Sequence, residues 1–221
     1  MACDINTLIL WIIFSPIIVF WGWLIFEWTI MRFIRHYYPF PAPYFVTAII
    51  DNPLRRNWVQ KASTIADRMD LKPGMTLIEI GPGKGGYTEI IAKSIPDGTI
   101  YAVDISEKVC MKLTKRLKKR KITNIIPVLG DVLDLTYFTD ASIDRIYSIS
   151  AFPEIPDHVK ALKEMARVLK PNGIIALSEI WIDPDFPRRT TERKWGLAAG
   201  LKIKAEFGHW YQYQLHFGKL E

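Results

Sequence analysis

Residues 77–88, LIEIGPGKGGYT, decide the fold of this chain. The stretch opens with a short, mostly apolar run that ends at Ile80 and continues with four glycines and one proline in residues 81–86. Glycine is used where the backbone takes a positive φ or must approach a ligand closely. The stretch therefore predicts a buried strand, then a tight ligand-binding loop, and then a helix that begins at Gly86.

Strand and helix patterns alternate on both sides of this loop. Strands are predicted at 76–80, 99–103, 124–129, 143–149 and 174–180, and helices at 58–69, 86–94, 106–119, 157–169 and 190–199. This alternation implies right-handed crossovers and a doubly wound, Rossmann-like parallel sheet of the α/β class. Two further strand-like runs, 201–207 and 211–217, are joined by so short a link that they must be antiparallel. We expect a mostly parallel seven-stranded sheet that ends in an antiparallel hairpin.

The beginning of the chain has a different composition. No charged residue occurs from Ile5 to Phe26, which is enough for a helix rising about 1.5 Å per residue to cross a hydrocarbon layer of about 30 Å. Residues 1–31 are therefore predicted to form one transmembrane helix. A cleaved signal peptide would need basic residues before a shorter apolar core, and a buried core helix is rarely apolar over such a length.

Charge predicts the orientation of this anchor. Basic residues such as Arg32 and Arg35 follow it, and only Asp4 precedes it, so the positive-inside bias places the following domain on the cytoplasmic side. The formal net charge of +6 fits a position near anionic headgroups. The two cysteines do not suggest a disulfide framework, in keeping with a reducing compartment. The expected localisation is a single-pass membrane protein with a cytoplasmic domain.

Residues 32–52 contain the motif RHYYPFPAPYF, in which aromatic residues alternate with prolines. Proline excludes a continuous helix, and aromatic side chains favour the membrane interface. Two interpretations stay open: a linker that lies on the bilayer, or a lid over the substrate pocket. The globular domain is expected to span residues 53–221.

The residues around the glycine loop discriminate between ligands. Gly81, Gly83 and Gly86 match the dinucleotide pattern GxGxxG, which is a weak signal by itself, and the P-loop order GxxxxGK[ST] is absent. Asp104 ends the next strand about 20 residues later, where a carboxylate accepts ribose hydroxyls. Glu79 would repel a pyrophosphate but attract the ammonium and sulfonium groups of S-adenosylmethionine. Charge therefore favours S-adenosylmethionine over a nicotinamide or flavin cofactor.

Four blocks of the sequence resemble the class I S-adenosylmethionine-dependent methyltransferases. Residues 77–85 resemble their motif I, YAVDIS at 101–106 their acidic second-strand motif, and GDV at 130–132 the position that holds the adenine. ALKEMARVLKPNGIIALSE at 161–179 resembles the block before strand five, especially in ubiquinone/menaquinone-type small-molecule methyltransferases. The terminal hairpin is similar to the antiparallel final strand of this family.

The resemblance implies a set of cofactor-binding residues. Those expected against the methionine part are Glu79, Gly81 and Gly83, those against the ribose and adenine are Asp104 and Ile105, and those against the adenine amino group are Asp131 and Val132. The alternative for the glycines is a role in the turn alone, and for Asp131 a role as a loop cap.

The acceptor side is predicted at SISAFPE, residues 148–154, which follows the fourth strand. It lacks the Asn/Asp-Pro-Pro-aromatic motif of many amine methyltransferases, which counts against nucleic-acid bases and protein amides. Methyl transfer depends mainly on positioning and exclusion of water, and Glu154 and His158 are the candidate catalytic bases by location. A helix cap and a surface histidine are the alternative roles. The histidines lack metal-ligand spacing, so no metal is expected.

Together these features predict a membrane-anchored methyltransferase that acts on a lipophilic small molecule, such as a prenylquinone precursor or a lipid headgroup. Its expected partners are the lipid bilayer, through the N-terminal helix, and this acceptor. Nucleic acid is not expected, because the basic run 115–121 belongs to a helix whose other face is apolar. Methylation of a protein side chain on a membrane partner, and a non-catalytic module that binds S-adenosylmethionine, are the alternatives. The sequence leaves the oligomeric state open.

Overall fold

The computed structural model describes residues 52–183 and 185–220, together with 14–19, 21–22, 25–26, 29–30 and 33 near the N-terminus. The chain forms two compact units, Met1–Pro39 and Phe40–Glu221. The described N-terminal pieces are helical, and apolar side chains such as Ile18 and Val19 are exposed on them. Among the described residues no helix is both long and apolar enough to span a bilayer. Most of the predicted anchor, and all of the predicted linker except Phe33 and Asn52, lies outside the described residues.

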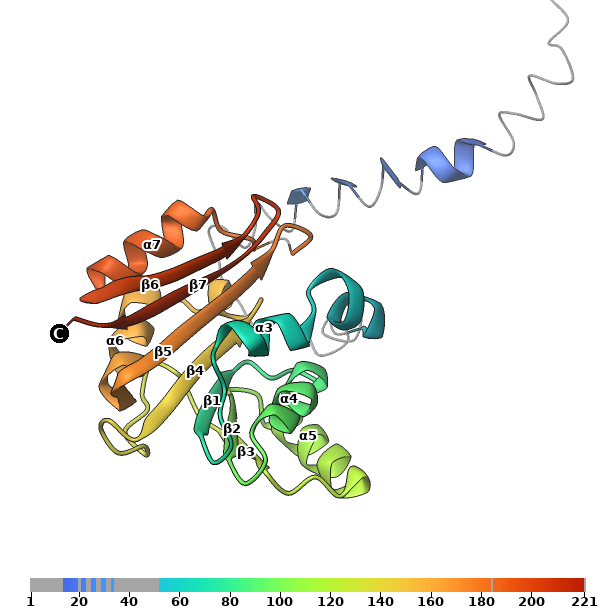
Figure 1. Cartoon of the computed structure of the whole chain (residues 1–221). Coiled ribbons are helices and arrows are strands. Elements are labelled where there is room, and N and C mark those ends of the chain that lie inside the picture. The colour runs from blue at the N-terminus through green and yellow to red at the C-terminus, as the bar shows by residue number, and fades with distance from the viewer. Residues whose placement is uncertain are drawn as a thin grey trace, which may run out of the picture. The chain divides into compact units, whose positions relative to one another are not determined.

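The second unit is built on a seven-stranded sheet with the order β3-β2-β1-β4-β5-β7-β6 (Figure 1). The strands are β1 (Thr76–Ile80), β2 (Thr99–Asp104), β3 (Ile125–Leu129), β4 (Ile143–Ile149), β5 (Leu169–Ile180), β6 (Leu201–Gly208) and β7 (Gln212–Lys219). The pairs among β1 to β5 are parallel, whereas β7 is antiparallel to both β5 and β6. The predicted sheet and its terminal hairpin are confirmed.

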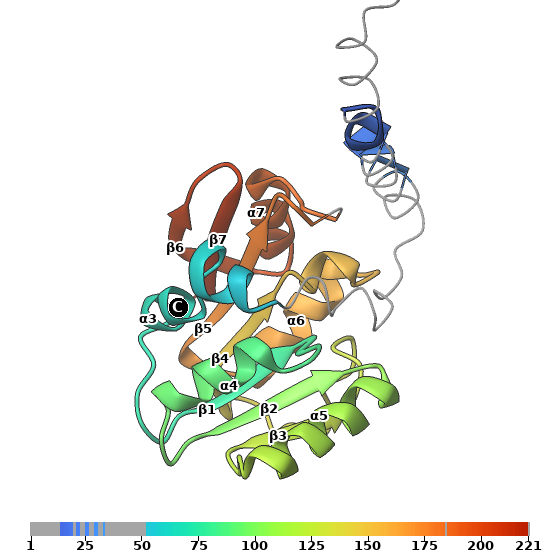
Figure 2. The same cartoon turned by 90° about the vertical axis from the view of Figure 1, so that its right-hand side faces the viewer.

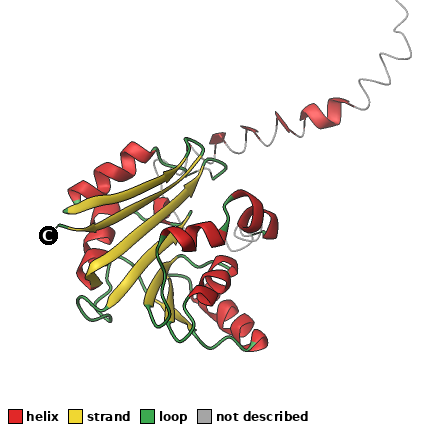
Figure 3. Cartoon of the chain, in the orientation of Figure 1, coloured by secondary structure: helices red, strands yellow, loops and turns green. Residues whose placement is uncertain are grey.

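Helices cover both faces of this sheet (Figure 2, Figure 3). The α-helices of this unit are α3 (Ala62–Arg68), α4 (Gly86–Ile91), α5 (Glu107–Arg120), α6 (His158–Val168) and α7 (Arg189–Ala198). Short helical turns occur at η1 (Arg55–Val59, a π-helix), η2 (Ala92–Ser94) and η3 (Phe152–Glu154). α3, α4 and α5 lie on one face, and α6 and α7 lie on the other.

The strand alternation explains the two hydrophobic clusters of the core. Successive side chains of a strand point to opposite faces. In β1, Leu77 packs with Ile65 of α3 and Ile91 of α4, whereas Ile78 packs in the other cluster with Leu162 and Met165 of α6. Because both faces are buried, the parallel strands are apolar along most of their length.

Two predicted boundaries are wrong for tertiary reasons. The helix predicted at 58–69 is interrupted: η1 ends at Val59 and α3 begins at Ala62, because the buried side chain of Gln60 between them bonds to Ser178 of β5, 118 positions away. The strand predicted at 174–180 begins five residues earlier, at Leu169, where it pairs with Ile143 of β4. The predicted N-cap of α5 is confirmed, since the Ser106 hydroxyl accepts the Val109 N–H at 3.4 Å.

Candidate active site

The glycine-rich loop after β1 takes a conformation that suits glycine. Gly81, Gly83 and Gly85 have φ values of 71°, 54° and 78°. A Cβ added at Gly81 would lie 2.4 Å from the Cβ of Ala151, which follows β4. The loop after β1 therefore packs directly against the segment after β4. This place is the carboxyl edge of the sheet, where open α/β folds bind their ligands.

Asp104 lies beside this loop at the end of β2. Its Oδ1 accepts the Ser106 N–H at 2.8 Å, and its carboxylate also accepts a backbone hydrogen bond from Gly83. Burial raises the pKa of Asp104, while these two backbone hydrogen bonds oppose the shift. The structure thus brings together two of the residues that the sequence predicted to contact the cofactor.

The other predicted adenine-side residues follow β2 and β3. The Gly130 N–H donates to the Asp104 carbonyl at 3.1 Å, which joins the ends of these strands. Asp131 accepts the Leu133 N–H at 2.9 Å and so stabilises its own turn. Val132 is buried in the core, and Ile105 is exposed, with 59% of its surface accessible. Exposed apolar surface beside two acidic residues suits a nucleoside.

Glu79 is buried inside β1 rather than exposed on the loop. The Tyr147 hydroxyl donates to Glu79 Oε2 at 3.0 Å, and the two residues are opposite each other in the β1–β4 register. Burial, together with the negative charge of Glu79, raises the pKa of Tyr147 well above its ordinary value. Sequence reasoning missed Tyr147, because a tyrosine in an apolar strand looks like ordinary core.

The two candidate bases have different surroundings. Glu154 is partly buried in η3. His158 stacks on Trp195 of α7, with ring centroids 3.6 Å apart and ring planes 6° apart, and its Nε2 is 3.4 Å from the Pro153 carbonyl oxygen. Burial lowers the pKa of His158. His158 is therefore part of the packing between α6 and α7, and not the surface residue of the alternative interpretation.

Sequence reasoning also missed a buried arginine network at the carboxyl edge. The Arg55 guanidinium donates to both carboxylate oxygens of Asp183, at 3.3 and 2.9 Å, and to the Ser150 hydroxyl at 2.6 Å. It also donates to Gln60 Oε1, and Gln60 in turn donates to the Ser178 hydroxyl at 3.1 Å. Ser150 has a positive φ of 55°, which is uncommon for a non-glycine residue. The network holds η1 against the ends of β4 and β5.

Two buried carboxyl groups lie on the face of the sheet that α6 and α7 cover. Glu179 of β5 and Glu192 of α7 are both fully buried, and neither oxygen of Glu179 has a hydrogen-bond partner among the described residues. Burial raises the pKa of Glu192 to about 8. Burial, followed by the charges of Glu192 and Asp183, raises the pKa of Glu179, and nearby Arg55 opposes this shift. At neutral pH this pair therefore retains a proton.

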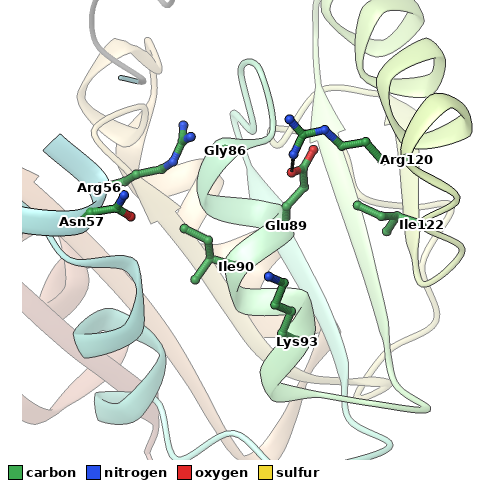
Figure 4. A pocket seen from close by; sticks show the side chains of 8 residues that line it. All are labelled: Arg56, Asn57, Gly86, Glu89, Ile90, Lys93, Arg120 and Ile122. Carbon is green, nitrogen blue, oxygen red and sulfur yellow. Dashed lines mark hydrogen bonds and ion pairs between the residues drawn. The ribbon is translucent and has the colours of Figure 1, made fainter. Parts of the chain in front are cut away.

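A separate pocket of about 490 Å³ lies between η1, α4 and the end of α5 (Figure 4). It is lined by Arg56, Asn57, Gly86, Glu89, Ile90, Lys93, Arg120 and Ile122. Glu89 and Arg120 point toward one another and form an ion pair, and Arg116 pairs with the same carboxylate. The pocket contains none of the predicted cofactor-binding residues, so its location does not mark the cofactor site.

The sheet order and the edge residues define a class. Its features are a central β1 with a glycine loop, acidic residues at the ends of β2 and β3, and a reversed final hairpin. A loop with three positive φ values next to the carboxylate of Asp104 fits a ligand that carries a ribose. This is the arrangement of a Rossmann-like nucleoside-binding domain.

Comparison with known proteins gives the particular family. The family described as "Methyltransferase domain" matches residues 71–214, so the chain belongs to it. The crystal structure of a SAM dependent methyltransferase from Aquifex aeolicus superimposes with a TM-score of 0.73 and 19% identity, over 80% of this chain and 98% of that one. The chain thus carries a methyltransferase domain, as predicted.

Curated relatives match a shorter stretch. A demethylmenaquinone methyltransferase of Geobacillus stearothermophilus is 30% identical over 113 residues, which are 51% of this chain and 48% of the relative. One from Staphylococcus carnosus is 35% identical over 112 residues, which are 50% of this chain and 45% of the relative. The chain spans about half the length of the curated relatives it matches.

Proposed function

We propose that the protein transfers the methyl group of S-adenosylmethionine to a lipophilic small molecule, such as a quinone precursor or a lipid headgroup. One observation supports methyl transfer most directly: the glycine loop contacts Asp104 at the carboxyl edge of the sheet, in a chain that belongs to the methyltransferase family. The relatives named demethylmenaquinone methyltransferase support a quinone-like acceptor.

The residues around the edge have distinct roles in this proposal. Bound S-adenosylmethionine supplies a methyl group on a positively charged sulfur. Asp104 accepts hydrogen bonds from the ribose hydroxyls, and Asp131 with the Val132 backbone holds the adenine amino group. Gly81 and Gly83 present bare backbone to the methionine part. Glu79 contributes negative charge below this part, and Tyr147 holds its carboxylate in place.

The arginine network borders the acceptor side. Arg55, Ser150 and Asp183 fix η1 over the ends of β4 and β5, which limits the entry of water. Positioning and exclusion of water supply most of what methyl transfer to an activated carbon requires. Where the acceptor must lose a proton, Glu154 is the favoured base, because the ring of His158 is engaged by Trp195.

We propose in addition that residues 5–26 anchor the domain to the cytoplasmic side of a membrane. The absence of charge over this segment and the basic residues that follow it support the anchor. An enzyme held at the bilayer encounters lipid-soluble acceptors at a high effective concentration.

Methyl-labelled S-adenosylmethionine tests the proposal. The full chain, reconstituted in vesicles, is incubated with a demethylated quinone or with a membrane lipid extract. Label in the organic phase is the expected result. Label in protein would favour methylation of a side chain, and no label despite binding of S-adenosylhomocysteine would favour the non-catalytic module. Asp104→Asn is the matched variant, in which transfer at subsaturating S-adenosylmethionine is expected to fall roughly tenfold to a hundredfold.

A further inference from the structure

Six large apolar side chains are exposed at the carboxyl edge of the sheet, and we call them the aromatic edge. They are Leu54 and Trp58 at η1, Trp181 and Ile182 after β5, and Trp210 and Tyr211 in the β6–β7 turn. Their exposed fractions range from 44% for Tyr211 to 76% for Trp210. Side chains of this size are usually buried, and a group of them on one surface marks an interaction site.

Contacts between the three segments make the aromatic edge one surface. The Trp181 N–H donates to the Tyr211 carbonyl at 2.7 Å, and the Trp181 and Trp210 rings meet edge to face at 6.4 Å. The buried pair of Arg55 and Asp183, at 2.9 Å, joins η1 to the loop after β5. The exposed rings therefore stand on a framework that is held by buried polar bonds.

The chemistry of this surface favours a lipid bilayer as its partner. Tryptophan and tyrosine combine an apolar ring with a polar group and settle at the boundary between headgroups and acyl chains. A cationic residue lies alongside: Arg189 donates to the His209 carbonyl next to Trp210. Two more, Lys61 and Arg188, are exposed and close in sequence to η1 and to Arg189. Such cations are attracted to anionic headgroups.

The chain that precedes this surface supports the same partner. The uncharged segment ends at Phe26, so a stretch of 28 positions leads to Leu54. Even fully extended, at about 3.5 Å per residue, this connection keeps the domain within roughly 100 Å of that segment. A bilayer that holds residues 5–26 would thus be constantly within reach of the aromatic edge.

The structure points to a docking surface: the aromatic edge lies in the headgroup region of a bilayer that contains anionic lipid. The carboxyl edge then opens toward the membrane, and a lipophilic acceptor reaches Ser150 and Glu154 without crossing water. The docking itself is independent of methyl transfer, whereas the support from residues 5–26 and the use of the surface for an acceptor rest on the proposed function.

Fluorescence quenching tests this orientation on the full chain. Cys3 and Cys110 are replaced by alanine, and an environment-sensitive fluorophore is attached through Trp210→Cys or, as a control, through Lys72→Cys on the exposed loop before β1. The protein is reconstituted in vesicles of phosphatidylcholine and phosphatidylglycerol. Spin-labelled lipid is expected to quench the label at 210 at least about threefold more than the label at 72. Iodide, which stays in water, is expected to quench the label at 72 more than the label at 210.

Two results would overturn the inference. Equal quenching of both labels by iodide would show that the aromatic edge faces water. Protection of the label at 210 from both quenchers would show contact with protein, either a second copy or another partner. Thermal stabilisation of each labelled protein by S-adenosylhomocysteine verifies the fold. Because no readout requires turnover, failure of docking is distinguishable from failure of the proposed methyl transfer.

Discussion

The hydroxyl of Tyr147 donates a hydrogen bond to the buried carboxylate of Glu79, across the β1–β4 register and directly beneath the glycine loop. A buried carboxylate is stable only where hydrogen bonds or charges compensate it. The pair therefore connects the stability of the sheet centre to the electrostatics of the cofactor site. This relationship can be tested by removing a single oxygen.

Tyr147→Phe is expected to lower the free energy of unfolding by about 1–3 kcal/mol, because Glu79 loses a buried partner. The affinity for S-adenosylhomocysteine should fall with it, since Glu79 is no longer held in place. Denaturant unfolding and calorimetry measure the two effects. The matched control is Tyr101→Phe on β2, whose ring packs on Phe138. Equal behaviour of the two variants would contradict the role given to the Tyr147 hydroxyl.

Asp104→Asn is expected to weaken binding of S-adenosylhomocysteine roughly tenfold to a hundredfold, because a charge-assisted hydrogen bond to the ribose is lost. The amide oxygen can still accept the Ser106 N–H, so the turn should persist. Asp97→Asn, in the exposed turn before β2, is the control and should bind like the wild type. An Asp104→Asn protein with unchanged affinity would remove Asp104 from the cofactor site.

Gly81→Ala should be far more damaging than Gly74→Ala. Both glycines have positive φ, at 71° and 78°, but only the Cβ at 81 would meet another atom, Ala151 Cβ at 2.4 Å. We expect a loss of about 1 kcal/mol at Gly74 from backbone strain alone, and about 2–4 kcal/mol at Gly81 from strain plus overpacking. Urea unfolding measures the difference. Similar losses would mean that the loop can move away from Ala151.

The pair Glu179 and Glu192 predicts how stability changes with pH. Because the pKa of Glu192 is raised to about 8 from 4.5, the folded chain retains a proton that the unfolded chain releases. The stabilisation of the folded chain by this protonated carboxyl group is therefore complete below about pH 4.5. It is lost as the pH rises from there through about 8. Glu192→Gln should match the wild type below about pH 4.5 and become several kcal/mol more stable than the wild type near pH 8.5.

Melting temperatures between pH 5 and 9 test this linkage. Glu107→Gln, which changes an exposed carboxylate at the start of α5, provides the comparison and should leave the shape of the pH profile unaltered. Parallel profiles for the wild type and Glu192→Gln would show that this carboxyl group ionises normally.

The ion pair of Arg55 and Asp183 should matter more than an exposed pair. Asp183→Asn leaves a buried guanidinium without its charge partner and is expected to cost about 3–5 kcal/mol. Asp140→Asn removes the exposed partner of Arg167, which should change stability by less than about 1 kcal/mol. Thermal unfolding of the two variants compares them. A small effect at Asp183 would show that η1 is held by other contacts.

The sequence by itself determined the sheet and much of its edge. Alternating apolar patterns specify strands and helices locally, and a three-residue link between β6 and β7 forces an antiparallel pair. The glycine loop and Asp104 follow the same logic, because residues at the ends of adjacent parallel strands must meet at one edge.

Only the tertiary structure decided which side chains complete that edge. Tyr147 reaches Glu79 because β4 lies beside β1, although 68 positions separate the two residues. Arg55 and Asp183 are 128 positions apart, and the stacking of His158 on Trp195 depends on how α6 meets α7. Local periodicity records only whether a residue is buried. Its partner is set by the order of the strands and the packing of the helices, so these contacts have no signature in the linear pattern.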